Sequence, residues 1–316
     1  MERAGQPRIL VCDPIDDGAL DLLRRHARVD VRTSLDPDEL VDIVDGYEGL
    51  VVRGRTQITS EVIEAATALR GIARVGFAVD NIDIEAATER GIVVVHSPGA
   101  RTHAVAEMTI GLILAVLRQI PAADRSVKAG RWERRAFRGR QLRGATVGVI
   151  GYGRIGREVA RLAHAFGATV KAYTHTPRPL EHAKQVDFQA LLASSDIITL
   201  HATLTSATRH LINRDAIEQM RDGVVIVNTA SGGLIDEAAL LEALERGKVA
   251  GAGLDVFADE PPSLRALVEH PRVVTTPRIG GSTQEADRAV SELALQSLLA
   301  VLRGEQPAVA VNPPGS

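Results

Sequence analysis

The ten residues from Val147 to Gly156, VGVIGYGRIG, constrain the fold of this chain more than any other stretch. An apolar, β-branched run leads directly into three glycines, and a helical pattern follows them. In such a strand–turn–helix unit the first glycine makes the tight turn, the second lets the backbone approach a pyrophosphate, and the third lets helix and strand pack closely. The phosphates then lie at the helix N-terminus, so the run predicts a dinucleotide site. The residues expected to form it are Gly151, Tyr152, Gly153, Arg154, Ile155 and Gly156.

Short β-branched runs alternate with amphipathic helical patterns along most of the chain. One series runs from Arg8 to Phe77 and a second from Thr146 to Pro277. This alternation predicts two α/β units, each with a parallel sheet covered by helices on both faces. The last helical pattern, Gln284 to Arg303, follows the second series, and its return to the first unit would make that domain discontinuous.

The bulk composition excludes several classes of protein. The chain has 316 residues, 45% of them hydrophobic and 24% charged, which is enough for two globular cores. Its net charge of −3 gives no broad electrostatic case for binding nucleic acid or an anionic membrane. The first residues lack a signal-peptide core and no apolar run is long enough to span a bilayer, so a soluble, cytoplasmic protein is expected. Cys12 lies in an apolar strand pattern, which predicts a buried, inert thiol.

A basic cluster precedes the glycine-rich run. It consists of Arg131, Arg134, Arg135, Arg138, Arg140 and Arg143. Nucleic-acid sites of this kind interleave aromatic platforms, and only Trp132 and Phe137 stand here. We therefore expect a solvated or subunit-contact arm and no nucleic-acid partner.

Four stretches of this chain resemble motifs of the D-isomer-specific 2-hydroxyacid dehydrogenases. They are DNIDIEAATERGIVVVHSPGARTHAVAEMTIGLIL (80–114), LRGATVGVIGYGRIG (142–156), NTASGGLIDEAALLEALERGKVAGAGLDVFADEP (228–261) and TPRIGGST (276–283). The resemblance implies an α/β fold of two doubly wound parallel-sheet domains. A flavodoxin-like substrate domain would comprise residues 1–99 and 286–316, and a Rossmann NAD(P)-binding domain residues 100–285. It also implies a homodimer built on an arm of about residues 102–143.

The same resemblance implies a catalytic set from which this chain departs. In the family, an arginine after NTA holds the substrate carboxylate, a histidine in TPHIGG exchanges the hydroxyl proton, and a glutamate before proline orients that histidine. Here Glu260 is kept, but Ser231 stands at the arginine position and Arg278 at the histidine position. Serine cannot form a bidentate ion pair and a guanidinium does not release a proton near neutral pH. An ion pair between Glu260 and Arg278 is expected, with relocation of the anion-binding charge to Arg278 as the alternative.

Other residues are candidates for proton transfer and substrate binding. His96 and His103 flank the segment that borders the substrate cleft in the family, and each is either a proton donor or a hydrogen-bonded hinge residue. The resemblance also assigns substrate contacts to Arg53 and to the amides of Phe77 and Ala78, where Ala78 replaces the second glycine of the family pattern. The Phe77 ring is either a wall of the substrate site or part of the core. No metal site is expected.

The position that selects between NAD and NADP favours NADP. An acidic residue about twenty positions after the glycines normally accepts the ribose hydroxyls of NAD, and Thr174 stands there instead. His175 and Arg178 follow it and can approach a 2′-phosphate, unless Arg178 only meets solvent. The resemblance places further residues near the nicotinamide or the phosphates. They are His201, Thr208, Thr229, Ala230 and Asp255.

Two classes of function remain open. The first is an NAD(P)-dependent oxidoreductase with an altered catalytic set, such as a reductase of a non-standard carbonyl or imine-like small molecule. Within this class, an ordinary 2-hydroxyacid or 2-ketoacid oxidoreductase with another proton donor is the alternative. The second is an NAD(P)-binding sensor or scaffold without turnover, which the loss of two catalytic residues suggests. We favour the enzyme.

Overall fold

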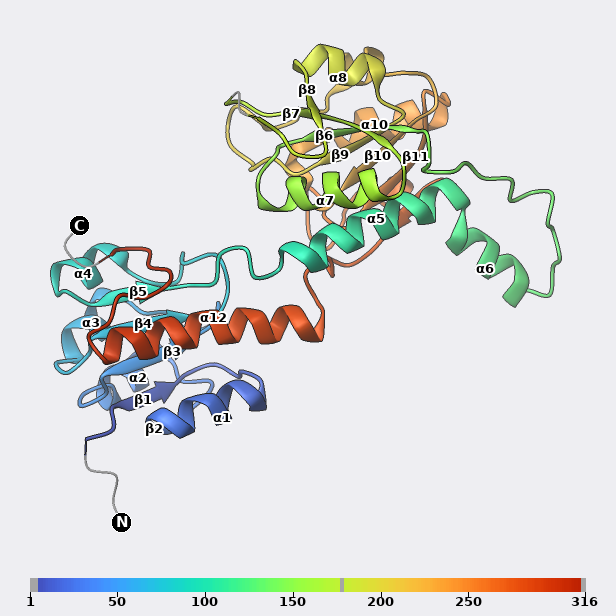
Figure 1. Cartoon of the computed structure of the whole chain (residues 1–316). Helices are drawn as coiled ribbons and strands as arrows, with labels where there is room; N and C mark the ends of the chain where they lie inside the picture. Colours follow the sequence, from blue (N-terminus) through green and yellow to red (C-terminus); the bar gives the residue numbers. More distant parts are fainter. Residues whose placement is uncertain (1–4, 177–178, 314–316) are drawn as a thin grey trace. The chain divides into compact units, whose positions relative to one another are not determined.

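The computed structural model describes residues 5–176 and 179–313, which form two compact units. Unit 1 comprises residues 1–101 and 283–316, and unit 2 comprises residues 102–282. The sequence placed the domain boundaries at 99/100 and 285/286, a few residues from this division. Both units are α/β structures with wholly parallel sheets, which confirms the predicted fold class (Figure 1).

Unit 1 contains a five-stranded parallel sheet in the order β2-β1-β3-β4-β5. Its strands are β1 (Arg8–Val11), β2 (Arg28–Val31), β3 (Gly49–Val52), β4 (Gly71–Arg74) and β5 (Val93–Val95). Its helices are α1 (Asp17–His26), α2 (Pro37–Ile43), α3 (Ser60–Ala65), α4 (Ile84–Glu89) and α12 (Gln284–Leu302). The central strands are apolar and buried, as expected where helices cover both faces of a parallel sheet.

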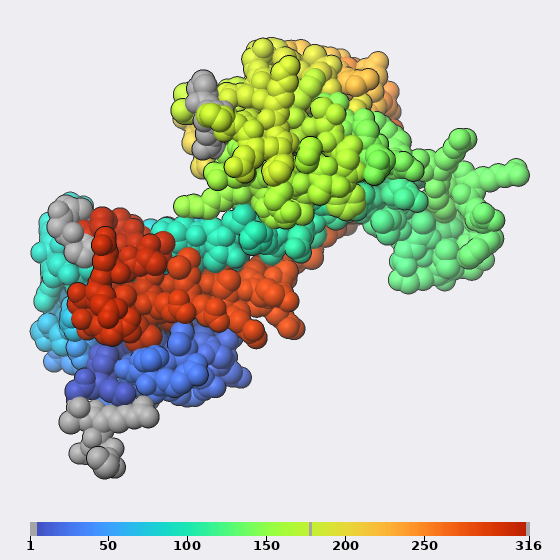
Figure 2. All heavy atoms as spheres, in the orientation of Figure 1, coloured from blue at the N-terminus to red at the C-terminus, as the bar shows by residue number. Residues whose placement is uncertain are grey.

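The C-terminal part of the chain completes unit 1. Helix α12 packs on β3, β4 and β5 and lies beside α1, as the red and blue segments of Figure 2 show. Apolar residues of α12 such as Leu295 and Leu298 belong to the same core cluster as Ile9 and Val51 of the sheet. On the other face, Cys12 is fully buried, which confirms the prediction, and burial raises the pKa of its thiol to about 12.

Unit 2 contains a seven-stranded parallel sheet in the order β12-β11-β10-β9-β6-β7-β8. Its strands are β6 (Thr146–Ile150), β7 (Thr169–Tyr173), β8 (Lys184–Gln185), β9 (Ile197–Leu200), β10 (Val224–Asn228), β11 (Val249–Leu254) and β12 (Val273–Thr275). Its helices are α5 (Thr102–Arg118), α6 (Ile120–Lys128), α7 (Arg154–Ala165), α8 (Phe188–Ser194), α9 (Arg214–Glu218), α10 (Glu237–Glu245) and α11 (Arg265–Val268). One core cluster joins the sheet to α5 and α7, and a second joins it to α8, α9 and α10.

Two features of α5 and α6 set them apart. Within unit 2, α6 and the segment after it project from the sheet and its covering helices (Figures 1 and 2). Among the described helices none is by itself long and apolar enough to cross a membrane, and α5 with α6 passes that test only as a pair bent by 62°. Ile110, Ile113 and other apolar residues of α5 are buried against the sheet of unit 2.

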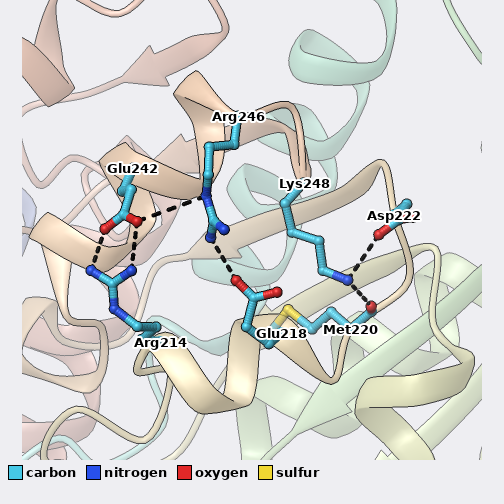
Figure 3. Close-up of polar contacts among 7 residues, drawn as sticks. All are labelled: Arg214, Glu218, Met220, Asp222, Glu242, Arg246 and Lys248. Atoms are coloured by element: carbon cyan, nitrogen blue, oxygen red, sulfur yellow. Dashed lines mark hydrogen bonds and ion pairs between the residues drawn. The ribbon is translucent and has the colours of Figure 1, made fainter.

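An ion-pair network joins α9 to α10 on the surface of unit 2 (Figure 3). Arg214 and Arg246 both contact the carboxylate of Glu242, and Arg246 also contacts Glu218 at 2.5 Å. The Arg214 guanidinium, through its hydrogen bonds, lowers the pKa of Glu242. Nearby, Lys248, directly before β11, binds Asp222 and the Met220 carbonyl, so it joins the start of β11 to the segment that follows α9.

We expect Arg214→Gln to lower the thermal stability of unit 2 at low ionic strength, because it removes two hydrogen bonds to Glu242 and leaves Arg246 as the remaining partner. The loss should shrink at molar salt, since salt screens exposed charges. The matched control is Arg265→Gln, which breaks a single exposed pair with Glu269. Melting curves of both variants at two salt concentrations measure the effect, and equal losses would contradict a cooperative network.

Candidate active site

The turn between β6 and α7 has the geometry of a dinucleotide loop. Gly151 has a φ of +93°, and a Cβ there would lie 2.6 Å from the His201 carbonyl carbon. A Cβ on Gly156 would lie 2.0 Å from the Gly151 carbonyl oxygen, so the helix can approach the strand only with glycine at both positions. A Cβ on Gly153 would meet nothing within 4 Å. The backbone at Gly153 is therefore open to a ligand while the turn beneath it is closed.

The first turn of α7 offers unsatisfied donors at the same place. Gly153 is the N-cap and supplies no side chain to bind the first amides of this twelve-residue helix. Together with the open approach over Gly153, these amides and the helix dipole fit an anionic pyrophosphate. Arg154 and Ile155 are the first two residues of this helix. The Tyr152 side chain is buried and its hydroxyl donates to the Glu181 carbonyl, so only its backbone belongs to the loop.

The residues expected to select the cofactor follow β7. Thr174 is half-buried directly after the last residue of the strand, and His175 is exposed beyond it. Arg178 lies outside the described residues. Thr174 therefore occupies the strand end where an acidic residue would accept ribose hydroxyls, and no carboxylate of its own is present there.

His201 follows β9 and lies against the glycine turn. Its amide donates to Ile150 at 2.7 Å and its Nε2 atom is 2.9 Å from the Thr199 hydroxyl. The Nδ1 atom is enclosed without a hydrogen-bond partner among the described residues. Burial lowers the pKa of His201 to about 3, so its imidazole is neutral near pH 7. His201 is suited to a neutral contact beside a cofactor and not to proton exchange at neutral pH.

The remaining predicted cofactor residues are mostly held by local hydrogen bonds. The Thr208 hydroxyl donates to the Thr203 carbonyl and closes a turn after β9. After β10, the Thr229 hydroxyl is buried 2.9 Å from that of Thr109, and the Ala230 amide donates to the Asn228 side chain. The structure thus brings these residues to the carboxyl edge of the sheet, where ligands bind in open α/β folds.

Asp255 organises the turn that carries Arg278. It is 3% exposed, and its carboxylate accepts hydrogen bonds from the Thr276 hydroxyl at 2.6 Å and from the amides of Ile279 and Gly280 at 2.8 Å each. Arg278 lies between these donors in the sequence and has a φ of +56°. This left-handed backbone conformation is unfavourable for residues other than glycine. Asp255 therefore acts as an anchor that holds Arg278 in an unfavourable backbone conformation.

Arg278 and Glu260 form the expected ion pair. The Arg278 Nη1 atom lies 2.6 Å from the Glu260 Oε2 atom, and their side chains are 68% and 33% exposed. Ser231 lies with them around an open hollow of about 280 Å³. The full lining is Leu204, Arg209, Ser231, Gly232, Gly233, Phe257, Ala258, Glu260 and Arg278. The three positions that resemble the family's catalytic set are thus gathered in unit 2, with the carboxylate engaged by a guanidinium.

The predicted substrate residues and His96 lie in unit 1, where they follow the carboxyl ends of its strands. The Phe77 ring is 68% exposed and stacks on His96 at 5.9 Å, so the alternative of a core ring is wrong. The Nδ1 atom of His96 is 2.9 Å from the Phe77 carbonyl oxygen, to which it donates. Ala78 is exposed, and the backbone of Arg53 is fixed by Asp13 and Asn81.

Two arginines with features of functional groups were not singled out from the sequence. Arg74, the last residue of β4, has an enclosed Nε atom without a partner among the described residues, and burial lowers the pKa of its guanidinium. Arg209 lines the hollow of unit 2. The place of Arg74 at a strand end was a usable signal. Arg209 lies in a loop whose course the sequence did not reveal.

Among the described residues, no group of three histidine, cysteine or acidic side chains is arranged to hold a metal ion. The site thus consists of a glycine turn, an uncapped helix terminus and a hollow lined by two arginines. This combination defines a nucleotide-binding α/β protein with a small polar pocket at the carboxyl edge of its larger sheet.

Residues 110–280 match the family described as D-isomer specific 2-hydroxyacid dehydrogenase, NAD binding domain. Hydroxypyruvate reductase of Thermotoga maritima is 47% identical over 90% of this chain and 94% of its own length. The chain belongs to the D-isomer specific 2-hydroxyacid dehydrogenase family. D-3-phosphoglycerate dehydrogenase of Archaeoglobus fulgidus is 48% identical over 97% of this chain, and this match spans 59% of that relative.

Solved structures share the fold of this chain. A protein from Thermus thermophilus matches with a TM-score of 0.84 and 40% identity, covering 96% of this chain and 99% of the other. An acyclic imino acid reductase in complex with NADPH and D-Arg matches with a TM-score of 0.81 and 26% identity, over 96% and 99% of the two chains. Both solved chains are therefore matched over almost their full resolved length, and the match covers nearly the whole of this chain.

We expect Asp255→Ala to lower the free energy of unfolding of unit 2 by on the order of 3 kcal/mol, because it leaves two turn amides without their charged acceptor. Urea titration measures the change. The control is Asp222→Ala, whose side chain is 90% exposed and should matter much less. Equal losses in the two variants would show that Asp255 does not anchor the turn.

The pH dependence of stability tests the burial of His201. The unfolded histidine takes up a proton below about pH 6.5 and the native one only near pH 3, so stability should fall as the pH drops through this window. Its contribution to the slope approaches one proton, or about 1.4 kcal/mol per pH unit. His201→Gln should lose this slope in urea titrations at several pH values, whereas His26→Gln, at an exposed position, should retain it. Parallel curves for His201→Gln and the unmodified protein would refute the assignment.

Proposed function

We propose that this protein is an NAD(P)-dependent oxidoreductase acting on a small molecule. The observation that carries the proposal is the turn at Gly151, Gly153 and Gly156. The backbone is tightly packed at Gly151 and Gly156 but open at Gly153, next to a helix terminus without a side-chain cap. These features fit a dinucleotide whose pyrophosphate rests on the first turn of α7. When bound, the nicotinamide supplies or accepts a hydride. The names of the relatives support an oxidoreductase.

NADP is the proposed cofactor. Thr174 at the end of β7 leaves no carboxylate to accept the ribose hydroxyls or to repel a 2′-phosphate, and His175 beside it is exposed. Arg178 is the proposed partner of the phosphate charge. The NADPH complex of the acyclic imino acid reductase is a precedent for this cofactor within the fold.

We propose that reduction of the substrate requires little proton transfer from the side chains of unit 2. The hollow contains Ser231 and the Glu260–Arg278 pair in place of an arginine and a histidine, and His201 near the glycine turn is neutral. A ketone accepts a hydride at carbon and must also take up a proton at oxygen. A protonated imine accepts a hydride at carbon and becomes an amine without a further proton. An imine-like substrate therefore matches these residues better than a 2-ketoacid.

Two alternatives each have a supporting observation. The Glu260–Arg278 ion pair favours an NAD(P)-binding sensor or scaffold without turnover, because the two charges satisfy each other. Ordinary 2-ketoacid chemistry with another proton donor is the second alternative, and its candidate donor is His96, whose Nδ1 atom binds the Phe77 carbonyl oxygen at 2.9 Å. One fold can serve many functions, so an assay must decide between these alternatives.

The assembly is proposed to be a cytoplasmic homodimer. Helix α6 and the arginine-rich segment after it project from unit 2, and Trp132, Val127 and Ile120 there are 78%, 54% and 53% exposed. A second copy that covers these apolar side chains would remove them from water.

The proposed function is tested by titrating the protein with NADPH and NADH, followed by fluorescence, and by assaying cofactor oxidation with 2-ketoacids, aldehydes and imines. We expect tighter binding of NADPH and turnover that is fastest with an imine. Failure to bind either nucleotide would overturn the proposal. Brisk reduction of 2-ketoacids would instead support the ordinary chemistry, and binding without turnover would support the sensor.

The altered residues can be tested directly by restoring the family's pair. We expect Ser231→Arg combined with Arg278→His to raise or create 2-ketoacid reduction, because it supplies a carboxylate anchor and a proton-exchanging group next to Glu260. A positioned acid–base group typically contributes about two to four orders of magnitude in rate. Ser231→Lys combined with Arg278→Gln is the control, which carries charge without a histidine. No gain in the restored variant would contradict the view that these two positions set the chemistry.

A further inference from the structure

One positive charge at the hollow of unit 2 has no partner in the part of the chain that the structure describes. Arg209 and Arg278 both line this hollow, but the carboxylate of Glu260 contacts only Arg278. Within residues 5–176 and 179–313 the Arg209 guanidinium forms no hydrogen bond or ion pair, and the Ser231 hydroxyl forms no hydrogen bond. The hollow therefore has a net charge of +1 and a free donor from each of these two side chains.

The backbone holds Arg209 beside the hollow. The amide of Arg209 donates to the Thr205 carbonyl at 2.9 Å, and the amide of the next residue, His210, donates to the Gly233 carbonyl at 2.8 Å. The Ile212 amide continues this pairing with the Leu234 carbonyl at 3.0 Å. The backbone after Arg209 is thus hydrogen-bonded to the segment that follows Ser231. Replacing the Arg209 side chain leaves these backbone hydrogen bonds intact.

Two glycines form part of the floor of the hollow and lie close to neighbouring atoms. A Cβ on Gly232 would lie 1.8 Å from the Phe257 carbonyl carbon, and a Cβ on Gly233 would lie 2.9 Å from a methyl carbon of Leu204. A side chain at Gly232 would therefore collide with the backbone, whereas one at Gly233 would meet only the end of the Leu204 side chain. The remaining space suits a small ligand, and the polar side chains that reach it are Arg209, Ser231, Glu260 and Arg278.

We propose that Arg209 binds the carboxylate of the substrate in this hollow and that the Ser231 hydroxyl donates a second hydrogen bond to it. A guanidinium presents paired donors that match the two oxygens of a carboxylate. Glu260 occupies the other guanidinium, so Arg209 is the charge available to an incoming anion. The inference rests on the proposed function in identifying this anion as the substrate, and it makes the preferred substrate an imino acid.

The test uses oxamate, a monocarboxylate that resembles a small 2-ketoacid, titrated into the NADPH-saturated protein in a calorimeter. We expect Arg209→Gln to weaken oxamate binding at least about tenfold and Arg209→Lys to recover part of the loss, because lysine keeps the charge without the planar fork. The control is Arg25→Gln, at an exposed position of α1 in unit 1. NADPH affinity and melting temperature should be the same in all variants, since the Arg209 side chain has no partner to lose among the described residues.

The outcomes separate this inference from the proposed function. Unchanged oxamate affinity in Arg209→Gln, or no oxamate binding by the unmodified protein, overturns the role of Arg209 while NADPH binding still supports the oxidoreductase. Failure to bind NADPH overturns the proposed function, and oxamate titration of the cofactor-free variants still decides the role of Arg209. A tenfold loss in Arg209→Gln with full affinity in Arg25→Gln supports the inference.

Discussion

The close contact between the end of β6 and the first turn of α7 is the constraint on which unit 2 depends. A side chain at Gly156 would collide with the Gly151 carbonyl, and one at Gly151 would collide with the backbone at His201. The contact sets how α7 lies on the sheet, and with it the core that α7 shares with α5. The same turn leaves the backbone open at Gly153, next to a helix terminus without a side-chain cap, which is the basis of the proposed dinucleotide site.

A second constraint acts at the hollow of unit 2. Asp255 is buried at the end of β11 and its three hydrogen bonds fix the turn of residues 276–280. Arg278 projects from this turn in a left-handed conformation and meets Glu260. The exposed pair adds little to stability. In the proposed function it matters because the carboxylate that the family pattern places beside a histidine is here paired with an arginine. Arg209, on the loop after β9, then provides the positive charge at the hollow that Glu260 does not neutralise.

The sequence predicted the fold class and the position of the glycine turn, because both depend on local patterns. Alternating apolar runs specified parallel strands, and the spacing of Gly151, Gly153 and Gly156 specified the turn. The ion pair between Glu260 and Arg278 also followed from the sequence, through the resemblance of their motifs. Asp255 was assigned to the cofactor side, and its role as the anchor of the Arg278 turn emerged only from its hydrogen bonds. The exposure of Phe77 and the position of Arg209 depend on tertiary packing and loop course, which no local pattern encodes.

The central claim is that the residues around the hollow transfer no proton near neutral pH. The most direct test measures NADPH oxidation with an N,N-dialkylated iminium acid, whose positive charge on nitrogen does not change with pH, between about pH 6 and 9. Because this substrate needs only a hydride, we predict turnover with a value of kcat/KM that stays level across the range. A value that follows the titration of one enzyme group near pH 7, or turnover of 2-ketoacids in preference to this substrate, would contradict the account.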